Sequence, residues 1–271
     1  MSTMETSNLT KEKLRNMFAE GKRFDSRGLF DFRDLEIELD VSNKAEGSAR
    51  VRLGKTEVIA GVKLEIGEPY SDSPDKGNLM VSGDLLPIAS PRFEAGPPGF
   101  EAIELPRLVD RAIRSSEILD FSKLVIKSGE KVWTVIVDVY PINDDGNLID
   151  AATIAALVAL RKAKFPELGK DGKINYKKKG TLLPLAKDIV PISLSFYKLG
   201  DSLFLDPTRE EEEASDTRIS FGISKWNGQY MLNSCQKKGA VSLSSSEIDE
   251  MMKIITQKFD ELDAKLKSMI K

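Results

Sequence analysis

The chain has 271 residues, a formal net charge of -3, 41% hydrophobic residues and 31% charged residues, as expected for a globular protein with a sizeable core in one large or two modest domains. The single Cys235 and the absence of histidine exclude an intramolecular disulfide, a cysteine-rich zinc site, a serine–histidine triad and an imidazole proton shuttle. Residues 1–15 lack the apolar core of a signal peptide, and the longest apolar run, Ala151 to Leu160, is too short to span a bilayer, so we expect a cytoplasmic protein without a membrane partner.

The first half of the chain is predicted to alternate strands with helices. Thr10 is expected to cap a short helix over residues 11–20 that ends at Gly21. The pair Gly54-Lys55 is the predicted turn between two strands. Asp150 is expected to cap the helix that follows the loop "NDDGNLID". From apolar alternation we expect strands over 35–41, 48–66, 78–89 and 131–142, and from helical spacing we expect helices over 103–114 and 151–164.

The second half is predicted to repeat this organisation. The basic segment Lys170 to Gly180 is interpreted as a solvated loop. Beyond it, Leu199-Gly200 occupies the same place in a hairpin as Leu53-Gly54 does in the first half, and strands are expected over 217–224 and 229–236. A capping box, Ser-x-x-Glu at Ser244, begins the last helix. Its predicted core stripe is Ile248, Met252, Ile255, Phe259, Leu262 and Leu266. We therefore predict an α+β fold built from a duplicated unit of sheet and helix.

Three arginines share one face of the helix predicted over residues 103–114. Arg107, Arg111 and Arg114 are four and three residues apart, which places them on one stripe of an α-helix. The opposite face is apolar, as in a helix that packs on a core. One interpretation is a solvated face in which Glu104, Asp110 and Glu117 form ion pairs with the arginines. The other is a surface that binds an anion, and the spacing alone leaves both open.

The segment Ala49 to Thr56, "ARVRLGKT", matches a loose form of the phosphate-binding loop of nucleotide-binding proteins. That loop needs a glycine-rich turn that leads into a helix, so that backbone amides surround the phosphate. Here the residues on both sides of Gly54 alternate as strands do. A nucleotide-binding protein is therefore the least favoured of our hypotheses, and an ATP-binding assay would test it.

The order of several motifs resembles the RNase PH-type proteins. "RFDSRG" at residues 23–28 is similar to the family's Arg-x-Asp-Gly-Arg signature, with Ser26 in place of glycine. The family's first hairpin is similar to "EGSARVRLGKTEVIAGV". Its central helix is similar to "AIELPRLVDRAIR", and the strand, loop and helix that follow are similar to "VDVYPINDDGNLIDAATIAALVAL". Its acidic segment is similar to "FLDPTREEEEASDTRISF". The resemblance covers about residues 23–265 and is greatest to the non-catalytic RNase PH-like subunit of the archaeal exosome, whose "PFEAGPP"-type loop is approximated by residues 93–98. It implies a duplicated RNase PH-like fold of the ribosomal protein S5 domain 2-like type.

The resemblance also implies that this chain has lost the active site. Catalytic relatives carry an Asp-x-Gly-Ser-Arg loop, and this chain has Asn147 and Leu148 in place of its serine and arginine. Catalytic relatives also carry paired arginines at the positions of Phe100 and Glu101. Because phosphorolysis needs donors that hold inorganic phosphate beside an RNA phosphodiester, we expect no catalytic residue, no metal site and no cofactor here. The carboxylates of residues 210–213 and 216 are interpreted as an acidic turn or helix start. The alternative hypothesis is an active phosphate-dependent 3′→5′ exoribonuclease.

The expected function is that of a structural and RNA-binding subunit of a 3′→5′ RNA-degrading ring. The resemblance implies that Arg107 and Arg111, with Arg114 one turn further, contact single-stranded RNA. It also implies a catalytic RNase PH-like partner, a hexameric ring of three heterodimers, and RNA-binding cap subunits. The expected divisions are an N-terminal helical extension (1–22), a first half (23–165), a basic connecting segment (166–188) and a second half with the C-terminal helix (189–271).

Overall fold

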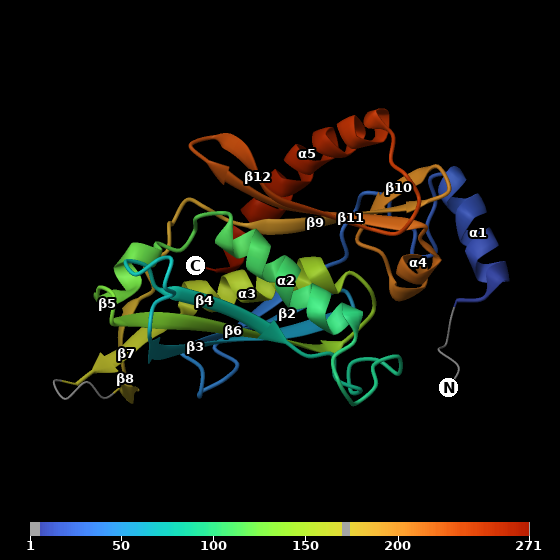
Figure 1. Cartoon of the computed structure of the whole chain (residues 1–271). Coiled ribbons are helices and arrows are strands. Elements are labelled where there is room, and N and C mark those ends of the chain that lie inside the picture. The colour runs from blue at the N-terminus through green and yellow to red at the C-terminus, as the bar shows by residue number, and fades with distance from the viewer. Residues whose placement is uncertain (1–5, 170–173, 271) are drawn as a thin grey trace.

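The first half of the chain forms a six-stranded mixed sheet in the computed structural model, which describes residues 6–169 and 174–270 (Figure 1). The strand order is β1-β2-β3-β6-β4, and β5 also pairs with β6. All pairs are antiparallel except β4 with β6. The strands are β1 (Leu35–Leu39), β2 (Gly47–Leu53), β3 (Thr56–Gly67), β4 (Asn78–Gly83), β5 (Val125–Lys127) and β6 (Lys131–Asn143).

Two helices lie between this sheet and a second one (Figure 1). They are α2 (Phe100–Arg114) and α3 (Leu148–Lys162). Helix α3 is buried on all sides from Leu148 to Leu160, as expected for a helix that contacts a sheet on either face. Gly47 makes the contact with β2 possible, because a Cβ there would lie 2.3 Å from the Ala159 carbonyl oxygen. The core is therefore continuous from one half of the chain to the other.

The second sheet has four antiparallel strands in the order β10-β9-β11-β12. They are β9 (Ile192–Leu199), β10 (Ser202–Leu205), β11 (Thr217–Trp226) and β12 (Gln229–Lys238), and the short helix α4 (Arg209–Ala214) lies between β10 and β11 in sequence. Helix α5 (Ser245–Met269) covers the face turned away from α2 and α3 (Figure 1). The predicted capping box of Ser244 and Glu247 is confirmed. In the apolar stripe of α5, Met251 is buried and Met252 is exposed, so the prediction was wrong by one residue there.

The predicted α+β fold is confirmed, as is the hairpin turn at each corresponding position. Gly54 and Gly200 both have positive φ, +59° and +61°, a conformation that glycine adopts without strain. The "ARVRLGKT" segment lies in the β2–β3 hairpin with no helix after it. Each half ends in a long helix, α3 and α5. Among the described residues, no helix is both long enough and apolar enough to cross a membrane.

Three local predictions were wrong. Helix α1 (Asn8–Ala19) begins earlier than expected, and its cap is Ser7, whose side chain accepts a hydrogen bond from the Thr10 amide. The strand expected over residues 78–89 ends at Gly83. The basic segment includes part of a hairpin of β7 (Lys164–Leu168) with β8 (Ile174–Leu182), although residues 170–173 lie outside the described residues. Another short element, the 3-10 helix η1 (Phe121–Leu124), precedes β5.

Three N-terminal arginines join the start of the chain to the second half. Arg23 forms a buried ion pair with Glu211 and donates to the Leu205 and Asp206 carbonyls. Arg33 and Arg27 lie 2.7 Å and 3.1 Å from the Asp206 carboxylate, which is fully buried. Since a buried carboxylate is stable only when it is paired and hydrogen-bonded, this cluster determines how residues 23–33 pack on the β10–α4 region.

Candidate functional site

Helix α2 carries the predicted arginine stripe at the protein surface. Its opposite face packs on the core as expected, through Leu105, Leu108, Val109, Ala112 and Ile113. Arg107 and Arg111 are exposed, and neither side chain forms an ion pair or hydrogen bond within residues 6–169 and 174–270. Two uncompensated cations one helical turn apart form a surface that attracts phosphate groups.

Arg114 differs from the two other arginines of the stripe. Its guanidinium lies 2.6 Å from the Asp110 carboxylate and donates to the Leu79 carbonyl oxygen at 2.8 Å. The hydrogen bonds that Arg114 donates to the Asp110 carboxylate raise the pKa of Arg114 above its ordinary value. Arg114 therefore has the ion pair expected of a solvated face, with Asp110 as its partner, whereas Arg107 and Arg111 have none within the described residues.

A groove of about 170 Å³ runs beside the two uncompensated arginines. It is lined by Phe100, Ile103, Glu104, Arg107, Leu108, Arg111 and Gln236. Phe100, Ile103 and Gln236 are lining residues that the sequence pattern does not predict. Phe100 and Ile103 extend the stripe at helical spacing, but exposed apolar residues cannot be told from core residues by spacing alone.

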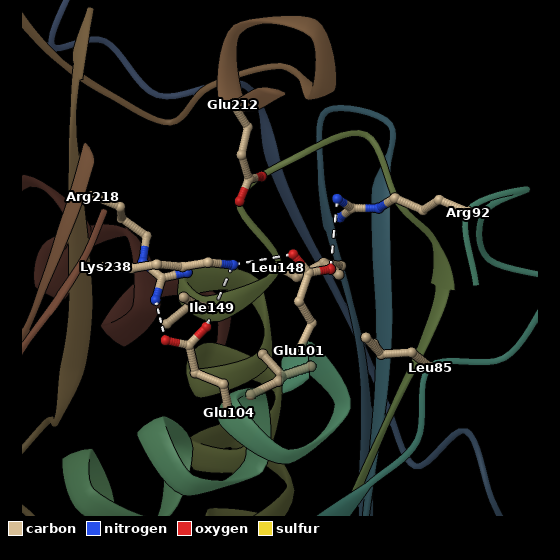
Figure 2. A pocket seen from close by; sticks show the side chains of 10 residues that line it. Leu85, Arg92, Glu101, Glu104, Leu148, Ile149, Glu212, Arg218 and Lys238 are labelled. Atoms are coloured by element: carbon tan, nitrogen blue, oxygen red, sulfur yellow. Dashed lines mark hydrogen bonds and ion pairs between the residues drawn. The ribbon is translucent and has the colours of Figure 1, made fainter. Parts of the chain in front are cut away.

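A second, smaller pocket lies where the N-terminal ends of α2 and α3 meet the second sheet (Figure 2). Its volume is about 30 Å³. Three cations and three carboxylates line it, namely Arg92, Arg218, Lys238, Glu101, Glu104 and Glu212. Glu101 and Leu148, which the resemblance led us to expect in place of phosphate ligands, both line this pocket.

The cations of this pocket are already bound to carboxylates of the same chain. Glu101 lies 3.1 Å from Lys238 and 3.6 Å from Arg92, and Glu104 lies 2.7 Å from Arg218 (Figure 2). Burial opposes the ionisation of Glu101, but Arg92 and Lys238 outweigh it and hold its pKa below the ordinary value. Glu101 is thus a charged, doubly paired group. Among the described residues that line the pocket, each of the three cations has a carboxylate partner.

A carboxylate also occupies the N-terminal end of α3. The Asn147 amide donates to Glu212 Oε2 at 2.9 Å, and the Tyr197 hydroxyl donates to Glu212 Oε1 at 3.1 Å. Burial raises the pKa of Glu212, against the effect of the Asn147 amide and Arg92. Because helix N-termini bind phosphate through such free amides, Glu212 fills a place that an anionic ligand would need.

The predicted cap of α3 was wrong. The helix begins after Asn147, which has φ +58°, and not after Asp150. Asp150 is instead fully buried in the first turn, where it accepts hydrogen bonds from the Ser195 amide at 3.2 Å and the Ser195 hydroxyl at 2.8 Å. Burial raises its pKa to about 7. Its role is to join α3 to β9.

The acidic segment forms the start of a helix, as interpreted from the sequence. Thr208 and Glu211 make a capping box at the beginning of α4. Glu213 lies 3.0 Å from Arg209, and Asp216 lies 2.7 Å from Arg15. With Glu211 held by Arg23, these carboxylates have structural partners.

The fold and this arrangement of helix, hairpin and acidic segment define a class of protein. The chain belongs to the 3′ exoribonuclease family, since the model of domain 1 matches residues 31–166 and the model of domain 2 matches residues 190–256. The resemblance to RNase PH-type proteins is thereby confirmed.

Its relatives include a particular exosome subunit. The chain is 42% identical to the exosome complex component Rrp42 of Methanosarcina acetivorans, over 94% of this chain and 92% of that protein, and 42% identical to Rrp42 of Archaeoglobus fulgidus, over 90% and 93%. It also matches a chain in a solved structure of the Archaeoglobus fulgidus exosome with RNA bound to the active site. That match has a TM-score of 0.85 and 40% identity and covers 94% of this chain and 97% of the other.

Proposed function

We propose that this chain is the non-catalytic, RNA-binding subunit of an archaeal exosome that acts in the cytoplasm. Its partner in the proposal is a catalytic RNase PH-like subunit, and three such heterodimers form a hexameric ring to which RNA-binding cap subunits attach. The similarity to Rrp42 over most of both chains supports the exosome role. The likeness to a chain of an RNA-bound exosome structure supports RNA as the ligand of the assembly.

One observation supports the non-catalytic part of the proposal above all others. Glu212 accepts the hydrogen bond of the Asn147 amide at the start of α3, where a phosphate ligand would need that donor. Glu101 adds a second negative charge to the same pocket and pairs with Arg92 and Lys238. An incoming phosphate would have to displace one carboxylate and overcome repulsion by the other.

The RNA-binding part rests on the stripe of α2. Arg107 and Arg111 offer uncompensated charge in solvent, which suits the phosphates of a single strand. Arg114 is proposed to contribute less, because a phosphate must compete with Asp110 for its guanidinium. In the proposed ring, this stripe completes the RNA route to the active site of the partner.

A reconstitution experiment tests which of the two subunits is catalytic. The chain alone, the catalytic partner alone and an equimolar mixture are each given uniformly labelled oligoadenylate, inorganic phosphate and magnesium, and released nucleoside diphosphate is measured. We expect no turnover by the chain alone, and a stable complex by light scattering whose activity exceeds that of the partner alone. Phosphate-dependent turnover by the chain alone, retained through a further purification step, would establish the alternative of an active phosphorolytic exoribonuclease.

A further inference from the structure

The arginine stripe of α2 continues toward the start of the helix as two exposed apolar side chains. Phe100, Ile103, Arg107 and Arg111 follow one another at steps of three, four and four residues, so they lie on one face. Phe100 is 66% exposed and Ile103 is 48% exposed. Because burying a phenylalanine or isoleucine is favourable, a helix that leaves both in solvent beside two free cations has the composition of a binding surface.

The groove beside the stripe gives these side chains a common cavity. Gln236 of β12 forms part of the opposite wall and brings an amide that can both donate and accept hydrogen bonds. Glu104 is acidic, alone among the described residues that line the groove, and Arg218 and Lys238 lie 2.7 Å and 3.9 Å from its carboxylate. Its charge is therefore compensated within the chain, and the groove presents a net positive charge.

The ring of Phe100 is held in place without being covered. The Lys238 ammonium lies 5.4 Å from the ring centroid, within the range of a cation–π contact. The same ammonium is bound to Glu101 at 3.1 Å. An aromatic ring that is anchored on one side and open to a cationic groove is suited to stack on a flat, neutral ring attached to an anionic backbone.

We propose that Phe100 forms a nucleobase subsite, in which one base of a bound single strand stacks on its ring while Arg107 and Arg111 contact the neighbouring phosphates. This inference rests on the proposed function, which supplies RNA as the ligand. Ile103 forms the apolar floor between ring and cations, and Gln236 faces the base edge from β12. A protein partner would cover the same stripe without requiring a base, and the experiment separates the two occupants.

The experiment measures binding of a fluorescein-labelled oligouridylate to the complex reconstituted with the catalytic partner. We expect Phe100→Ala to weaken affinity by about five- to a hundredfold, the equivalent of one stacked base. Phe100→Trp should retain the parent affinity, because the larger ring stacks at least as well. The slope of log affinity against log salt should be the same for Phe100→Ala as for the parent, because no phosphate contact is removed. Phe24→Ala is the matched control, since Phe24 is also an exposed phenylalanine, at 43%, and lies outside α2.

An oligouridylate series with one abasic position at a time identifies the stacked base. In the parent complex, one position should lower affinity when its base is removed, and Phe100→Ala should abolish that sensitivity. If Phe100→Ala binds as well as the parent while the double variant Arg107→Gln/Arg111→Gln binds more weakly, the base subsite is wrong and the proposed function stands. If the arginine double variant also binds like the parent, the proposed RNA surface itself is wrong. If Phe100→Ala prevents assembly, the stripe is a protein interface, which overturns the subsite.

Discussion

Replacing Arg107 and Arg111 by glutamine removes two charges from the surface without disturbing the fold. Both side chains are exposed and have no ion pair within the described part of the chain, so the double variant should change the free energy of unfolding by about 0.5 kcal/mol or less. Each lost phosphate contact should lower the slope of log affinity against log salt by about 0.7 for a single strand. Two contacts therefore lower it by about 1.4, and raising salt fourfold should weaken the parent about sevenfold more than the variant.

The assay is equilibrium binding of a labelled single strand to the assembled complex across a salt series, with two sequences of different base composition. The loss should be equal for both sequences, because phosphate contacts carry no sequence information. Lys253→Gln serves as the control, since Lys253 is exposed on α5, which packs on the other side of the second sheet. Arg114→Gln should lower the slope of log affinity against log salt by less than the same substitution at Arg107 or Arg111 does, because Asp110 already binds the Arg114 guanidinium. A double variant with the slope and affinity of the parent would refute the assignment of this stripe.

Three further predictions concern the core. The pKa of Asp150 is raised to about 7, so the native state holds this proton more tightly than the unfolded chain does. The free energy of unfolding should therefore fall as pH rises from about 4 to about 7, by up to about 4 kcal/mol. Asp150→Asn should flatten this dependence in urea unfolding at pH 5 and 8, and an unchanged pH profile in the variant would contradict the assignment to Asp150. Asp206→Asn should cost about 3–5 kcal/mol in the same assay, because it leaves the buried Arg33 without its carboxylate; a loss below 1 kcal/mol would show that the pair contributes little. Gly47→Ala should cost about 1–3 kcal/mol, because its Cβ would meet the Ala159 carbonyl oxygen of α3. Gly99→Ala, with nothing within 4 Å of the new Cβ, should cost only about 0.5 kcal/mol, the difference between glycine and alanine at the N-cap of α2.

The sequence was sufficient for the elements whose signals are local. Alternation in β2, β3 and β6, the turn at Gly54 and the capping box at Ser244 each depend on residues within a few positions of one another. The burial of one face of α2 and the exposure of Arg107 and Arg111 followed from helical spacing in the same way. The division of the chain at residues 22, 165 and 188 stays a prediction.

Two of the wrong predictions depended on contacts between distant parts of the chain. Aspartate is a common N-cap residue, which made Asp150 the expected cap. Instead α3 begins three residues earlier, after Asn147, whose amide donates to Glu212, 65 residues further along the chain. Met251 and Met252 fit the stripe of α5 almost equally, and only the packing of α5 on the second sheet selects Met251. For the candidate site, spacing identified the arginines, but the exposure of Phe100 depends on what the rest of the fold leaves uncovered.

The cluster around Asp206 has a consequence for how the protein is made. Arg33 bonds to a carboxylate 173 residues further along the chain, and Arg23 to one 188 residues further. At translation rates of roughly 5–20 residues per second, these arginines leave the ribosome about ten to forty seconds before their partners. During that interval residues 23–33 lack their Asp206 and Glu211 partners, and the nascent first half presents uncovered core surface along α3. The last contacts of residues 23–33 therefore form only after most of the message has been translated, so the first half stays incompletely packed during most of its synthesis.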